Sequence, residues 1–131
     1  MGTMPDEEHV PAYVREHGPL QLPLRVIHLA NEIGTLKQEA AWGRDNRLAR
    51  TLAKEGQLRL VLTVMRAGVR LQEHQTEGAL ALQCIEGSLR LHTQISHPIE
   101  LRAGELVALD GGVTHSVEAV TECAFLLTVA Q

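Results

Sequence analysis

Two histidines lie in stretches whose residue types could do chemistry. His74 lies in "GVRLQEHQTEGALALQCIEG" and His115 lies in "GELVALDGGVTHSVEA". A neutral imidazole is a common ligand of transition metals, and with a pKa near 6.5 it can also hydrogen bond to an organic ligand around neutral pH. Both stretches combine glycines with apolar residues of strand type. We therefore take His74 and His115 as the centre of the candidate site.

Glycines frame both histidines at regular spacings. Gly68 and Gly87 flank His74, while Gly104 and Gly112 precede His115. This spacing resembles the two motifs of the cupins, small β-barrels of the jelly-roll type, written G(x)5HxH(x)3-4E(x)6G and G(x)5PxG(x)2H(x)3N. The resemblance covers roughly residues 57–130, and the similarity to small single-domain bacterial cupins extends back to about residue 29.

The sequence departs from the cupin pattern at the ligand positions. Thr76 occupies the second histidine position and Leu80 occupies the glutamate position, while Asp110 and Ala119 replace the proline and asparagine of the second motif. In metal-binding cupins three histidines and a glutamate point into the barrel, so the resemblance implies a metal site at His74 and His115 that lacks two of its four ligands. Stable protein metal sites generally offer three or four.

Neighbouring residues complete this ligand set poorly. Strand periodicity sends Cys84 to the inward face but about 13 Å from the glutamate position, and it sends Gln83 and His92 outward. Glu73 and Glu77 flank the first motif and would enter the site only through a distorted loop.

Three interpretations of the two histidines stay open. In the first, they hold a weakly bound divalent metal, and waters or a small carboxylate fill the rest of its coordination sphere. In the second, they are the polar anchors of a metal-free ligand pocket. In the third, they are hydrogen-bonded interior groups without a ligand. The pocket would bind a small, mainly hydrophobic molecule with one acceptor or anionic group, to which an imidazole donates. Its expected lining is Thr76, Leu80, Leu82, Val117, Ala119 and part of 58–64.

The resemblance alone leaves the function open, because one scaffold hosts many activities. The leading expectation is a small-molecule-binding cupin without demonstrated catalysis. The alternative is a metal-dependent oxygenase or isomerase that uses His74, His115 and an unconventional third ligand. A third possibility is the sensor domain of a regulatory partner.

Period-two alternation in "QLRLVLTVMRAG" predicts a strand. Glycine-punctuated strands follow at 79–86, 88–93, 97–102, 105–110, 114–120 and 122–130. Short strands of this kind predict an all-β cupin double-stranded β-helix barrel. We expect an irregular, proline-containing N-terminal arm over 1–26, a single cupin domain over 27–131, a leading helix over about 27–41 that packs outside a sheet, and a barrel core over about 47–130.

Composition limits the possible partners. Aromatic residues make up 2% of the chain and no apolar run approaches the ~20 residues of a membrane span, so neither nucleic acid nor membrane is expected as a partner. Cys84 and Cys123 fall in strand segments and are expected to be reduced core thiols of a cytoplasmic protein. The resemblance to cupins implies a homodimer, and the region of Trp42 with the preceding helix is the expected contact.

Overall fold

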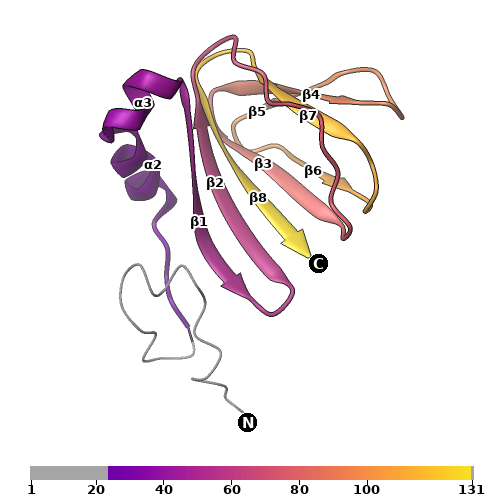
Figure 1. The fold of residues 1–131 in the computed structure, drawn as a ribbon, viewed down its shortest axis with the longest axis horizontal. Coiled ribbons are helices and arrows are strands. Elements are labelled where there is room, and N and C mark those ends of the chain that lie inside the picture. The colour runs from indigo at the N-terminus through magenta and orange to yellow at the C-terminus, as the bar shows by residue number, and fades with distance from the viewer. Residues whose placement is uncertain (1–23, 131) are drawn as a thin grey trace.

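Within residues 24–130, two antiparallel sheets and two short helices make up the fold (Figure 1). The computed structural model describes residues 24–130, so almost all of the arm predicted over 1–26 lies outside the described residues. The elements in chain order are α2 (Leu29–Lys37), α3 (Ala40–Asp45), β1 (Arg47–Glu55), β2 (Leu58–Met65), β3 (Leu80–Glu86), β4 (Ser88–Thr93), β5 (Ile99–Arg102), β6 (Leu106–Leu109), β7 (His115–Ala119) and β8 (Cys123–Ala130).

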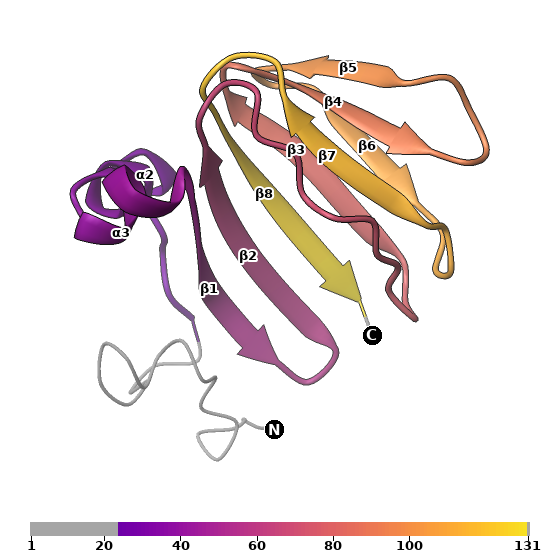
Figure 2. The same cartoon turned by 45° about the horizontal axis from the view of Figure 1, so that its top comes forward.

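The sheets face each other around one apolar core. The larger sheet has the strand order β1-β2-β8-β3-β6 and the smaller has the order β5-β4-β7. Figure 2 shows the smaller sheet lying across from the part of the larger sheet that contains β3 and β6. Side chains of both sheets, among them Leu82, Leu91 and Phe125, form a single buried cluster between them. This is the predicted all-β jelly-roll, and β2 to β8 confirm the predicted strands.

β1 is a strand that the sequence pattern does not predict. It pairs with β2 along its length, but the register shifts between Thr51 and Ala53. The extra residue, Leu52, is buried against the helices. A bulge of this kind breaks the alternation on which strand prediction depends.

The helical segment is two helices instead of the predicted one over 27–41. α2 ends at Lys37, Gln38 caps it, and α3 begins after Glu39, whose backbone is extended. Ile33 and Leu36 of α2 pack against the outward face of the larger sheet, as predicted. The helices therefore form a third layer outside the barrel.

The two faces of β2 have different partners. Leu60, Leu62 and Val64 pack toward the helices, while Thr63 and Met65 pair with Phe125 and Cys123 of the barrel core. The interior lining expected from 58–64 thus comes from the odd-numbered residues, since the leucines face outward.

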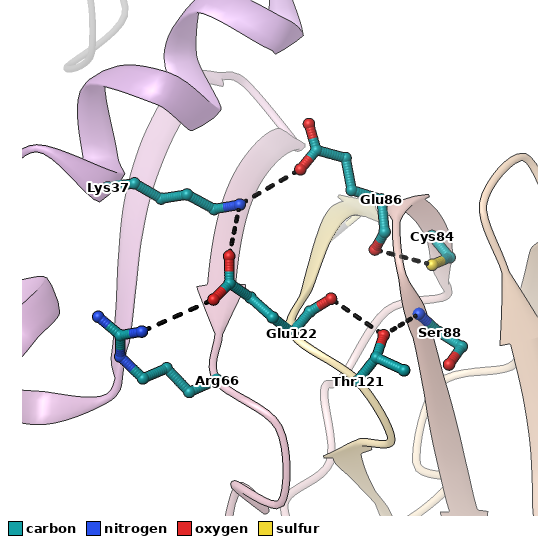
Figure 3. Close-up of polar contacts among 7 residues, drawn as sticks. All are labelled: Lys37, Arg66, Cys84, Glu86, Ser88, Thr121 and Glu122. Carbon is teal, nitrogen blue, oxygen red and sulfur yellow. Dashed lines mark hydrogen bonds and ion pairs between the residues drawn. The ribbon is translucent and has the colours of Figure 1, made fainter.

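A polar junction ties α2 to the barrel (Figure 3). The Lys37 ammonium lies 2.9 Å from a Glu122 oxygen and 3.3 Å from Glu86, and the Arg66 guanidinium lies 3.6 Å from the other Glu122 oxygen. The pKa of Lys37 is above its usual value: burial, the largest single influence, lowers it, but hydrogen bonds to the two carboxylates outweigh that effect. The junction joins the end of α2 to the ends of three barrel segments.

The region of Trp42 with the preceding helix is the predicted contact between copies. The Trp42 side chain is 6% exposed and packs within its own chain, with the Arg66 guanidinium 4.3 Å from the ring centroid. The indole itself is therefore covered within its own chain. A homodimer stays a prediction.

The glycines that carry the cupin spacing all adopt positive φ angles. Gly68, Gly87, Gly104 and Gly112 have φ values of 85°, 73°, 92° and 83°. Residues with a Cβ rarely adopt this conformation. The motif glycines are therefore backbone requirements of the turns between strands.

Gly87→Ala tests this requirement. A Cβ at Gly87 would overlap the Glu122 carbonyl oxygen, in addition to the strain of its positive φ. We expect the free energy of unfolding to fall by about 2 kcal/mol or more in chemical denaturation. Gly34→Ala is the control, because Gly34 lies in α2 with open space around it and should gain about 0.5–1 kcal/mol. Equal effects of the two substitutions would contradict the assignment.

Lys37→Met tests the junction. Removal of the partly exposed ion pairs should lower the free energy of unfolding by about 0.5–1 kcal/mol at pH 7. Folding raises the pKa of Lys37 above its ordinary value of 10.5. The contribution of Lys37 to the free energy of unfolding is therefore complete below pH 10.5 and is lost as the pH rises through the folded-state pKa. The gap between wild type and variant should therefore close above that pH. Lys54→Met is the control, since no described residue forms an ion pair with exposed Lys54; an equal loss there would count against the junction.

Candidate functional site

An irregular segment, residues 68–76, brings His74 to His115. This segment runs along the free edge of β7, where the backbones of His74 and His115 exchange two hydrogen bonds of 2.9 Å. Further backbone bonds join Gly68 and Leu71 to β7. Residues that exchange both bonds in an antiparallel pair carry their side chains on the same face. The two predicted site histidines are therefore neighbours.

The imidazole rings are in contact but differ in exposure. Their centroids are 4.4 Å apart and the ring planes are tilted by 57°. His115 is 1% exposed, whereas His74 lies on the surface. His74 thus forms the outer member of the pair, and His115 lies behind it in the barrel interior.

A backbone carbonyl fixes the hydrogen-bonding role of His115. Nδ1 lies 2.9 Å from the Val113 oxygen, which can only accept, so Nδ1 carries the proton. Burial is the main cause that lowers the pKa of His115 below its usual value; the bond to Val113 opposes this, and neighbouring His74 adds to it. The ring is then neutral near pH 7 and Nε2 is a hydrogen-bond acceptor.

The Nε2 atom of His115 is buried and makes no hydrogen bond with any residue in 24–130. Buried polar atoms in proteins nearly always have a partner, and each exception calls for an explanation. A missing partner costs about 1–3 kcal/mol. The unpartnered Nε2 of His115 is therefore the atom of the site that calls for an explanation.

The other predicted site residues have structural roles. The Thr76 hydroxyl donates to the Gly78 carbonyl at 2.8 Å, which uses its proton within the turn. Leu80 and Leu82 are 5% and 0% exposed and belong to the core between the sheets. Leu80 therefore places hydrocarbon where metal-binding cupins have a carboxylate.

These residues do not fit a metal ion. Within the described part of the chain, no cluster of three or more histidine, cysteine or acidic side chains could hold one. Glu73 and Glu77, which a distorted loop would have had to bring in, lie on the surface. Two imidazoles alone, one of them tied to a carbonyl through Nδ1, leave most of a coordination sphere unfilled.

Two side-chain pairs that sequence analysis did not single out support the segment carrying His74. The Arg70 guanidinium donates to the buried Ser116 hydroxyl from 3.1 and 3.3 Å, and the Gln75 amide donates to Thr114 at 3.0 Å. Both pairs join 68–76 to the chain around His115. The sequence signal for them is weak, because pairing depends on an irregular strand partner.

His92 faces outward, as predicted. Its Nε2 lies 2.8 Å from the Glu118 carboxylate on the outer face of the smaller sheet, and this contact lowers the pKa of Glu118. His97 and His28 are on the surface. His9 and His17 lie outside the described residues.

Both cysteines are buried in strands, as predicted. Cys84 and Cys123 are 0% exposed and unpaired. Burial raises the pKa of both thiols, that of Cys123 to about 12. Thiolates are the reactive species, so neither cysteine is suited to nucleophilic chemistry.

Thiol titration checks this conclusion. At pH 8 a pKa of about 12 leaves roughly one Cys123 side chain in ten thousand ionised. We expect an aromatic disulfide reagent to leave both thiols of the folded protein unmodified over an hour and to modify both in guanidinium chloride. Rapid modification of one thiol in the folded protein would show an accessible thiolate.

Solved structures with a similar fold include two small bacterial cupins. A cupin-2 domain protein from Shewanella frigidimarina is 20% identical, with a TM-score of 0.64 over 81% of this chain and 95% of that chain. An RmlC-like cupin from Desulfovibrio desulfuricans is 20% identical, with a TM-score of 0.66 over 82% and 97%. A salicylate 1,2-dioxygenase variant from Pseudoaminobacter salicylatoxidans is 15% identical, with a TM-score of 0.69 over 79% of this chain and 34% of that one.

The chain therefore has the cupin fold. No protein-family model matches the sequence, and comparison with curated proteins gives no match. Identities of 20% or less show the fold and leave the activity to the site itself. Within residues 24–130 there is no helix with the length and apolarity of a membrane span.

Proposed function

We propose that this protein is a metal-independent cupin that binds a small organic molecule at the His74–His115 end of its barrel. The observation that carries the proposal is the buried, unpartnered Nε2 of His115 beside the exposed ring of His74. A bound ligand would supply the missing hydrogen-bond partner. The surrounding aliphatic core would supply the apolar contacts that small-ligand sites generally have.

The position of His74 supports an entry route for the ligand. His74 is exposed and belongs to a segment whose backbone pairs with β7, while its Val69 and Leu71 side chains pack on the core. Its side chain makes one weak polar contact, 3.5 Å from Nδ1 to the Gln72 oxygen. Rotation of this ring needs no strong bond to break, and it would open a path to His115. Surface side chains change rotamer within nanoseconds.

The enzyme alternative requires a metal that the donor set does not fit. Thr76 and Leu80 stand where a histidine and a glutamate would be required, and the Thr76 hydroxyl already donates to Gly78. The fold shared with a dioxygenase does not restore those ligands. A binding function needs only the residues that are present.

Metal analysis and ligand stabilisation together test the proposal. Untagged protein should contain far less than one equivalent of any transition metal after dialysis. A library of small neutral fragments should contain members that raise the melting temperature, because a ligand at 100 times its Kd stabilises the folded state by about 2.7 kcal/mol. This stabilisation should disappear in His115→Leu and persist in His97→Ala, a matched change at an exposed histidine.

Two results would contradict the proposal. Near-stoichiometric metal that disappears in both His74→Ala and His115→Ala would favour the metal-dependent enzyme. Stabilisation of wild type and His115→Leu by the same fragments would place the binding site elsewhere in the molecule.

A further inference from the structure

We infer that the ligand presents a hydrogen-bond donor to His115 Nε2, and that its class is a neutral alcohol, phenol or amide on an apolar body. This inference rests on the proposed function and specifies the chemistry of the same site. It replaces the expectation from sequence that the ligand carries an acceptor or anionic group toward an imidazole donor.

The fixed proton on Nδ1 sets the polarity of the site. Val113 accepts that proton at 2.9 Å, so the ring cannot turn its remaining nitrogen into a donor without losing this bond. A neutral imidazole has one donor and one acceptor, and only the acceptor is free here. A ligand oxygen without a hydrogen would meet the Nε2 lone pair with its own lone pairs.

Within residues 24–130, no lysine or arginine side chain acts on the His115 ring to hold an anion there. Arg70, the nearest arginine along segment 68–76, donates to Ser116 on the opposite face of β7. The glutamate position holds the hydrocarbon of Leu80, and Val117, two residues along the same strand, is 2% exposed in the apolar core. A carboxylate placed here would lose its hydration without gaining a charged partner, which is strongly unfavourable.

His74 provides the adaptable second contact. The 3.5 Å separation between its Nδ1 and the Gln72 oxygen is too long to fix the proton on either nitrogen. Its exposed ring can therefore donate to, or accept from, the far side of a ligand hydroxyl. A hydroxyl group both donates and accepts, so it can bond Nε2 of His115 and a ring nitrogen of His74 together.

Three fragments of similar shape discriminate between the possible classes of ligand. Cyclohexanol carries a hydrogen-bond donor, methoxycyclohexane carries a neutral acceptor, and cyclohexanecarboxylate is an anion. Dissociation constants would be measured with the whole 131-residue chain by NMR titration at pH 7.5. Long-range proton–nitrogen spectra of histidine-labelled protein would follow both ring nitrogens. We expect cyclohexanol to bind at least tenfold more tightly than the other two and to shift the His115 Nε2 resonance.

The outcomes separate the inference from the proposed function. Binding of the ether or the carboxylate as tightly as the alcohol, with a shift at His115, would overturn the donor inference and keep the site. Absence of any His115-dependent binding, here and across the wider library, would overturn the function itself. The nitrogen shifts of free wild-type protein give a test without substitution: a proton on Nε2 instead of Nδ1 would overturn the donor inference, even if His115→Leu failed to fold.

Discussion

The exchange of two backbone hydrogen bonds between His74 and His115 is the contact on which the site depends. It joins an irregular segment to β7 and places the two side chains on the same face of the sheet. The two residues differ in exposure because His74 belongs to the outer segment 68–76 and His115 belongs to β7. The chemistry of the pair follows from a second backbone contact, the Val113 carbonyl, which orients the inner ring.

The larger sheet needs a layer on each side because both of its faces are apolar. The smaller sheet covers the face that contains Met65 and Phe125, and the helices cover the face that contains Leu62 and Val64. Charged side chains at the end of α2 hold this outer layer in place (Figure 3). The apolar core between the sheets therefore contains no side chain of α2 or α3.

The sequence predicts the barrel well because alternation and positive-φ glycines are local signals. Both act within a few residues, and they predict β2 to β8 and the turns at Gly87 and Gly112. The bulge at Leu52 hides β1, and the break between α2 and α3 leaves no clear mark in an otherwise helical pattern. Alternation could not show which face of β2 meets the barrel, since both faces carry aliphatic residues.

The candidate site was only partly predictable for the same reason. Motif spacing singles out His74 and His115, which the structure brings together, and Leu80 lies in the apolar core. The role of each ring nitrogen depends on one carbonyl that no sequence pattern marks. The contact of His115 with the Val113 carbonyl and the Arg70–Ser116 pair both depend on tertiary structure, and the first is the basis of the inferred direction of hydrogen bonding to a ligand.

Gly111 links the two halves of the site in another way. Its backbone lies against the Glu77–Gly78 turn so closely that a Cβ would overlap the Glu77 carbonyl oxygen, while the neighbouring Gly112 amide donates to the Thr76 oxygen. The turn after the first histidine and the turn before the second are consequently one compact unit. An insertion in either turn would displace the other, so loop lengths on the two sides are expected to vary together among relatives.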